Sequence, residues 1–211
     1  MKFIARLAAF IAGLFIMGLG ICLVSISGLG NSPISSPSWV LSQCTSLSFG
    51  TWTLLFTVVF FAGELLLYGW KRRPDIWLQL PVAPVLGLII DLFMNLIPNG
   101  GNASLLQSLL LLAGGCFTLA GGIWMQVKAS VVINPGEGIV KAFACRLGKQ
   151  FGTVKLIFDS SLVALAFILS IIFLGRVEGL GVGTIVSAVT VGPLVRLCDR
   201  LWSRSRLTIV P

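Results

Sequence analysis

Histidine is absent from this 211-residue chain, and charged residues make up only 10% of it. Without an imidazole the chain cannot form a His-containing metal site, a Ser-His-Asp triad or a Cys-His nucleophile. It also contains no P-loop, no GxSxG motif and no pair of carboxylates at a spacing typical of hydrolases. We therefore expect neither an enzyme nor a protein that binds a metal or a cofactor.

Cysteines are few and scattered. The five residues show no CxxC spacing, and most lie in apolar runs, where free cysteines behave as small buried hydrophobes. A disulfide framework is typical of small secreted domains and is not expected here. Acidic residues are also few, so the net charge is +8. We attribute this excess to basic loops on one side of a membrane and expect no nucleic-acid partner.

Apolar residues dominate the chain: they make up 56% of it, and the mean hydropathy is +1.01. A helix of about 20 apolar residues suffices to cross a bilayer, and several runs approach or exceed this length. We therefore predict an all-α membrane protein, formed by a single polytopic domain over residues 1–211. The six predicted transmembrane helices span residues 7–26, 51–70, 76–97, 105–127, 153–174 and 184–201.

The first of these runs follows two basic residues, as the core of a signal peptide would. It is longer than the ~7–15 apolar residues of a signal peptide, and no A-x-A cleavage site follows. We interpret it as a retained transmembrane helix. Gly13, Gly18 and Gly20 give this helix a face of small residues suited to close helix packing.

Two segments of the chain match others at a constant offset. Ser32-Pro33 corresponds to Asn134-Pro135, and Phe49-Gly50-Thr51 recurs as Phe151-Gly152-Thr153, each 102 residues later (135 − 33 and 151 − 49). The preceding apolar runs match at the same offset. The pattern predicts an internal repeat of two copies, with a turn-rich connection between them. The predicted repeats are residues 1–100 and 101–211, and the connection is residues 98–102.

The basic residues predict the orientation of the spans. If the N-terminus lies inside, the inner segments carry every Lys and Arg except Arg176, in agreement with the positive-inside rule. We therefore predict a multi-pass membrane protein with its N-terminus and its C-terminus inside. Since each repeat contains three spans, the two repeats would lie in the membrane with opposite orientations. This inverted-repeat architecture is typical of many transporters.

Each repeat carries a helix-start signal just after its first span. In the first repeat, Asn31 or Ser32 precedes Pro33, and proline suits the first position of a helix. In the second, Asn134 is the predicted N-cap, and Glu137 lies at the spacing of a capping box. Glu137 either caps its own helix or contacts a cation, a proton or a solute nitrogen. We predict short helices that start at the two prolines and end near residues 46 and 146.

The starts of these short helices form the predicted binding site. Helix N-termini carry free N–H groups and the positive end of the helix dipole. If both helices dip into the membrane, their N-termini face each other near its midplane and favour an anionic or strongly polar solute. The basic residues of the second helix could instead hold it flat on the inner surface. The alternatives to two dipping helices are therefore two surface helices, or one dipping helix and one surface helix. The candidate residues are Asn31, Ser32, Pro33, Ser35, Asn134, Pro135, Gly136 and Glu137.

Glu64, Asp91 and Asp159 lie within apolar spans, where a carboxylate is costly and usually faces a cavity or a partner. We predict these residues as candidates for coupling transport to ions or protons. Each also has a structural interpretation: Asp159 can pair with Lys155 one turn earlier, Asp91 can form a polar cluster with Asn95, and Glu64 can extend its carboxylate toward the inner surface.

The end of the chain resembles that of the bacterial YczE/YyaS/YitT-like membrane proteins, in the segment Gly179-Leu180-Gly181-Val182-Gly183-Thr184-Ile185 followed by Val191-Gly192-Pro193. The segments Gly28–Pro33 and Asn134–Gly138, together with Asp159, fit the same pattern. The resemblance covers most of the chain. It implies a multi-span inner-membrane protein and supplies neither a substrate nor a catalytic residue.

Together, these features favour a transporter or channel for a small solute, which acts in the lipid bilayer alone or as a homodimer. The alternative is a membrane subunit or scaffold that transports nothing itself and assists another protein.

Overall fold

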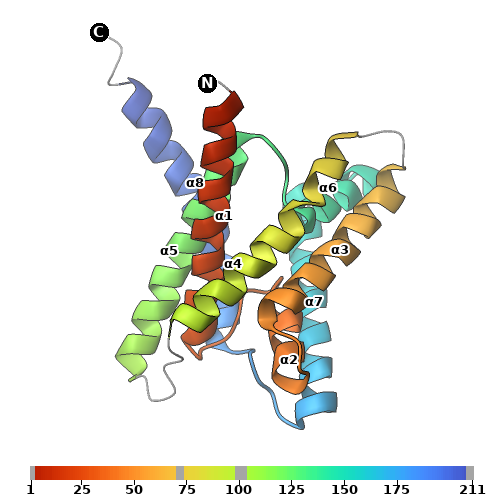
Figure 1. The fold of residues 1–211 in the computed structure, drawn as a ribbon, viewed down its shortest axis with the longest axis vertical. Coiled ribbons are helices and arrows are strands. Elements are labelled where there is room, and N and C mark those ends of the chain that lie inside the picture. Colours follow the sequence, from red (N-terminus) through yellow and green to blue (C-terminus); the bar gives the residue numbers. More distant parts are fainter. Residues whose placement is uncertain (1–2, 70–73, 98–103, 208–211) are drawn as a thin grey trace.

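The computed structural model describes residues 3–69, 74–97 and 104–207, and the regular structure within these ranges is helical (Figure 1). The predicted connection at residues 98–102 lies outside the described residues. The elements are α1 (Phe3–Ile26), α2 (Ser36–Cys44), α3 (Phe49–Tyr68), the 3-10 helix η1 (Pro74–Gln79), α4 (Val82–Leu96), α5 (Leu105–Ala129), α6 (Pro135–Leu147), α7 (Phe151–Leu174) and α8 (Val182–Leu207).

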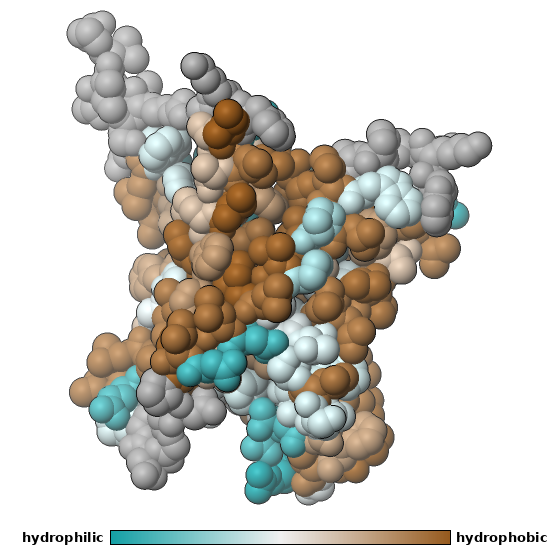
Figure 2. Space-filling model, viewed as in Figure 1, coloured by the Kyte–Doolittle hydropathy of each residue, from teal (hydrophilic) through white to brown (hydrophobic). Residues whose placement is uncertain are grey.

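Six segments among the described residues are long and apolar enough to cross a membrane, as predicted. Hydrophobic side chains cover most of the surface between the two ends of the molecule in Figure 2. The third segment is not one continuous helix, because η1 ends at Gln79 and α4 starts only at Val82. Pro81 and Pro84 lack the N–H group that an uninterrupted α-helix needs there. The six segments are Ile4–Ile26, Phe49–Tyr68, Ile76–Leu96, Leu105–Ala129, Phe151–Leu174 and Val182–Trp202.

The contact between α1 and α5 is the most extensive in the fold, and glycines make it possible. Gly20 of α1 lies against the backbone of Leu119, and Gly122 of α5 lies against that of Met17. A Cβ atom at Gly122 would come within 2.7 Å of the Met17 Cα atom. Two helix backbones can approach this closely only where a side chain is missing. The predicted small-residue face of the first helix is therefore confirmed in part: Gly13 and Gly20 pack on α5, whereas Gly18 packs on Ile89 of α4.

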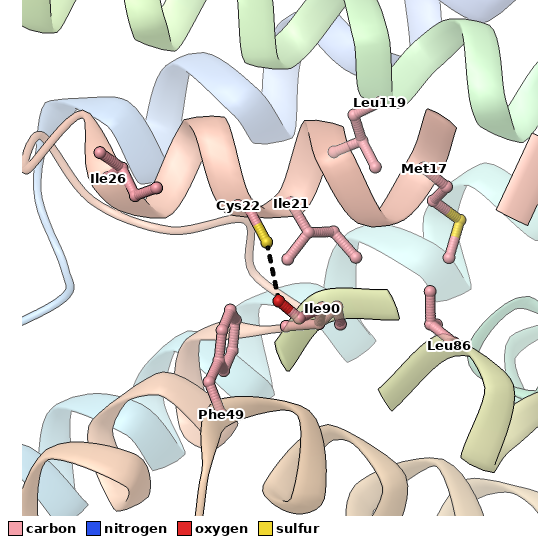
Figure 3. Packing of buried hydrophobic residues seen from close by; sticks show 8 residues of the cluster. All are labelled: Met17, Ile21, Cys22, Ile26, Phe49, Leu86, Ile90 and Leu119. Atoms are coloured by element: carbon pink, nitrogen blue, oxygen red, sulfur yellow. Dashed lines mark hydrogen bonds between the residues drawn. The ribbon is translucent and has the colours of Figure 1, made fainter. Parts of the chain in front are cut away.

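A buried apolar cluster extends this contact to α3 and α4 (Figure 3). Within it, the thiol of Cys22 donates a hydrogen bond of 3.3 Å to the carbonyl of Ile90, so this cysteine is an interior residue, as expected. α4 in turn crosses α3 where Gly50 meets Gly87: a Cβ atom at Gly87 would lie 2.7 Å from the Gly50 carbonyl oxygen. The cluster consists of Met17, Ile21, Cys22, Ile26, Phe49, Leu86, Ile90 and Leu119.

Both predicted short helices are present, and each packs against α3 and α7. In Figure 1, α2 lies toward the end of the molecule away from the chain termini, and α6 lies nearer the end that carries them. The predicted bounds of α6 are confirmed to within one residue, but the predicted start of α2 at Pro33 is wrong. Residues 33–35 form a turn, and the helix begins at Ser36. Pro37 then occupies the first turn of α2, where a missing N–H costs least.

Two adjacent glycines of α5 allow a matched test of the contact with α1. Gly122→Ala should destabilise the protein by about 1–3 kcal/mol, because the new methyl group overlaps the backbone of Met17. Gly121→Ala meets nothing within 4 Å, so it should leave stability unchanged or raise it by less than about 1 kcal/mol through helix propensity. Thermal unfolding of both variants in one detergent tests this. Equal melting temperatures would contradict the close approach of α1 and α5.

Candidate functional site

The segment that leads from α1 to α2 is fixed by Asn31, which is 1% exposed. Its backbone N–H donates to the carbonyl of Gly179 at 3.0 Å, and its side-chain amide donates to the same carbonyl at 3.1 Å. Its Oδ1 atom accepts a hydrogen bond from the Ser25 hydroxyl. A further bond of 2.7 Å joins the N–H of Gly183 to the carbonyl of Leu29. The loop before α2 is thus interlocked with the loop before α8.

Buried serines complete the turn before α2. The carbonyl of Ser32 accepts the N–H groups of Ser35 and Ser36 at 3.0 and 2.9 Å. The hydroxyls of Ser32 and Ser35 lie 2.7 Å apart in a hydrogen bond, and the Ser36 hydroxyl donates to the Ser32 carbonyl at 2.9 Å. The polar groups of these three serines therefore find partners within the turn, as an apolar environment requires.

α6 begins at Pro135 with Asn134 as its N-cap, as predicted. The Oδ1 atom of Asn134 accepts the N–H of Gly136 at 3.1 Å, and its carbonyl accepts the N–H groups of Glu137 and Gly138 at 2.9 and 2.8 Å. Pro135 has no N–H to offer. Asn134 thus occupies the donors of the first turn, which were expected to be free for an anion.

The predicted capping box of α6 does not form. The Asn134 side chain accepts the N–H of Gly136 rather than that of Glu137, and the carboxylate of Glu137 contacts α7. The Lys155 ammonium lies 3.2 Å from Oε1 of Glu137 and 3.0 Å from Oδ1 of Asp159. The predicted pair of Lys155 and Asp159 one turn apart is therefore confirmed. Lys155 also joins it to Glu137, so one ammonium connects two carboxylates on two different helices.

The two interrupted segments meet. The side chain of Ile34, in the turn before α2, packs so closely on Gly136 that a Cβ atom there would overlap it. On α3, Glu64 is 3% exposed, and its carboxylate lies against Gly138, where a Cβ atom would come within 2.8 Å of the carboxylate carbon. The interior position of Glu64 does not fit an extension toward the surface. The first turn of α6 thus has Ile34, Glu64 and the ammonium of Lys155 around it.

Asp91 is not part of this group, and its expected cluster with Asn95 is replaced by another contact. The carboxylate accepts the Ser48 hydroxyl at 2.6 Å and the backbone N–H of Gly50 at 2.7 Å. Both donors lie at the N-terminus of α3, where an acidic group is favoured by the helix dipole. The geometry therefore assigns Asp91 a capping role.

Two features of the site were missed in the sequence. The link between Asn31 and Gly179 has a faint signal, because Gly-Leu-Gly occurs both at 28–30 and at 179–181. The contact between Glu137 and Lys155 has no signal in the sequence, because a separation of 18 residues (155 − 137) matches no spacing at which side chains of one helix meet. Among the described residues, no three His, Cys, Asp or Glu side chains gather closely enough to hold a metal ion.

The model of a family of unknown function, DUF6198, matches residues 4–200. The chain belongs to the DUF6198 family. It is also 31% identical over 190 residues to the uncharacterized protein YyaS of Bacillus subtilis (strain 168), with 88% of each chain covered. The resemblance noted in the sequence is therefore confirmed. No solved structure matches the chain. Together with the six candidate spans, these findings describe a multi-pass membrane protein of the DUF6198 family with a bacterial relative.

Substitution of Asp91 separates the contribution of its cap from that of its charge to stability. Asp91→Ala should destabilise the protein by about 1–2 kcal/mol, because α3 loses a carboxylate cap. Asp91→Asn should cost less than about 1 kcal/mol, since its amide oxygen can still accept the Gly50 N–H. Thermal unfolding in detergent gives both values. If Asp91→Asn proved as destabilising as Asp91→Ala, the charge rather than the cap would be what the fold requires.

Proposed function

We propose that this protein is a small-solute transporter of a bacterial inner membrane, with both termini inside. The observation that carries the proposal is the contact between the two interrupted segments, Ile34 against Gly136, with three carboxylates close to the first turn of α6. Two of these, Glu64 and Asp159, lie on candidate spans. Backbone that leaves a helix at membrane depth is tolerated where it is buried in protein or lines a cavity. In transporters built from repeats, such interruptions occur at the solute site.

The inverted repeat is supported by the positions of the helices. α3 starts at residue 49 and α7 at residue 151, a difference of 102 residues. This is the offset found in the sequence. The order of a long helix, a short helix and two further spans recurs in each half.

The contacts between α1 and α5 also exchange under this offset. Gly20 lies against Leu119, and shifting both residues by 102 gives the pair Gly122 and Met17 (20 + 102 and 119 − 102), which are in contact as well. Such an exchange is what a two-fold axis between two related halves produces. α2 packs on α7, and correspondingly α6 packs on α3. The short helix of each half is therefore held by a long helix of the other.

The side chains near α6 favour a cationic or neutral polar solute over an anionic one. Asn134 occupies the N–H groups of the first turn, so an anion would find no free donor there. Glu64, Glu137 and Asp159 surround the same turn, and the described residues close to it include one ammonium, that of Lys155. We therefore replace the anionic solute expected from helix dipoles with a solute that carries positive charge or hydrogen-bond donors.

A non-transporting subunit or scaffold is the second candidate, and one observation favours it. α7, α8 and the loop between them line an apolar groove whose walls include Val163, Ala164, Phe167, Leu180 and Ile185. The corresponding helices of the first half, α3 and α4, are instead closed on each other through Gly50 and Gly87. A helix of a partner protein would fit into the groove between α7 and α8, whereas α3 and α4 are in contact at the corresponding place.

Thiol labelling at the contact of the two segments tests the transporter. In a variant without the five native cysteines, we expect Ile34→Cys to react with a membrane-impermeant thiol reagent added on either side of proteoliposomes. The reason is that a transport pathway opens the site to each side in turn. Leu66→Cys is the control: Leu66 is 85% exposed on a candidate span and should react from neither side. Labelling of Ile34→Cys from one side alone would contradict alternating access and favour the scaffold.

A further inference from the structure

We propose that Lys155 is the positioning residue that holds α6 against α7, and that its contact with Glu137 is the one that opens when α6 moves. We call the arrangement of Glu137, Lys155 and Asp159 the Lys155 bridge. The inference rests on the proposed transport function, since it identifies which of the two short helices moves and what releases it. Lys155 is absent from the residues that the sequence singles out for binding or coupling.

The two arms of the Lys155 bridge differ in what they connect. Asp159 lies one turn after Lys155 on α7, so this arm of 3.0 Å does not depend on the position of α6. Glu137 lies on α6, so the arm of 3.2 Å is made or broken as α6 moves relative to α7. A buried charge left without a partner is strongly destabilising. When Glu137 moves away, Lys155 keeps its ion pair with Asp159. Opening the bridge therefore does not leave the ammonium without a partner.

Exposure also favours release at the Glu137 end. The Glu137 side chain is 34% exposed, against 26% for Lys155 and 17% for Asp159. A carboxylate that departs from Lys155 at this end can be hydrated, whereas Asp159 is more enclosed. The other charged residues of α6, Lys141 and Arg146, are exposed. On α3, Glu64 lies against Gly138. α2, which also packs on α7, contains no charged residue.

The first half of the chain has no such bridge at the matching positions. Subtracting 102 from the three residue numbers gives Ser35, Thr53 and Thr57, all hydroxyl residues. The hydroxyls of Thr53 and Thr57 donate to the carbonyls one turn earlier in α3, at 2.8 and 2.7 Å. The turn before α2 is instead fixed by the hydrogen bonds that Asn31 makes with Gly179. A charged, separable contact is thus found on the α6 side, which makes α6 the moving element and α2 the fixed one.

Hydrogen exchange of the full-length protein in nanodiscs tests this assignment. Glu137→Gln and Lys155→Gln should each speed amide exchange in the first turn of α6, residues 136–138, by about tenfold, because each removes the arm between the helices. Asp159→Asn should leave this exchange unchanged, since the arm to Glu137 remains. Thr53→Val with Thr57→Val is the matched control in the other half and should leave α6 unchanged. Exchange in α1 serves as an internal reference for global loosening.

Swapping the charges of residues 137 and 155 tests whether the attraction between opposite charges, rather than the shape of the two side chains, holds α6. Lys155→Arg should keep the slow exchange. Glu137→Lys combined with Lys155→Glu restores opposite charges between α6 and α7 but places a carboxylate beside Asp159. We therefore expect the double variant to exchange fast and the triple variant with Asp159→Asn to recover slow exchange. A triple variant that stays fast, or an Asp159→Asn variant as fast as Lys155→Gln, would overturn the proposal.

Thiol labelling separates a failure of this proposal from a failure of the transport function. If Ile34→Cys is labelled from both sides and the Lys155→Gln exchange is unchanged, transport stands and the role of Lys155 is refuted. If exchange responds as expected but Ile34→Cys is labelled from one side alone, Lys155 holds α6 in a protein that does not alternate. Under the proposal, adding Lys155→Gln to Ile34→Cys raises the labelling rate, because the first turn of α6 covers Ile34.

Discussion

The fold depends on one constraint: backbone that leaves a helix inside an apolar bundle must find its hydrogen-bond partners within the protein. The chain does this twice, and each time an asparagine provides the solution. Asn31 binds the carbonyl of Gly179 through both its backbone and its side chain. Asn134 accepts the N–H groups of the first turn of α6. Because these partners lie inside the protein, two interrupted segments can lie in contact between the long helices without exposing backbone to lipid.

A second constraint, the closeness of α1 and α5, places the two segments opposite each other. Gly20 and Gly122 let the backbones of these helices meet, and each helix leads directly into one interrupted segment. A bulkier pair would separate the helices, and with them Ile34 from Gly136. The glycines of the crossing therefore act on the site from a distance. They set the spacing of the two segments, whereas the asparagines set the conformation of each.

Much of this architecture could be predicted because it follows from local patterns. The apolar runs gave the six candidate spans, and the sequence Asn-Pro-Gly-Glu gave the start of α6, since length and capping depend on neighbouring residues. The start of α2 was misplaced because Pro33 and Pro37 both suit a first helical turn, and only the packing of the loop decides between them. The hydrogen-bond partners of Asp91 were missed for a related reason. Its partners, Ser48 and Gly50, lie on another helix, and no pattern within α4 indicates them.

The difference between the two halves is as informative as their likeness. Two copies with identical contacts would hold both short helices equally, and nothing in such a structure would decide which one moves. Here the α2 side relies on neutral hydrogen bonds to a neighbouring loop, and the α6 side on an ammonium between two carboxylates. Neutral hydrogen bonds respond less to an added charge than an ion pair does, because a cation competes directly for the carboxylate of the ion pair. If the protein moves a positively charged or proton-coupled solute, the arrival of that charge at Glu137 would itself loosen α6. Binding and movement would then be one event at one residue, and the neutral half would provide the fixed frame against which it occurs.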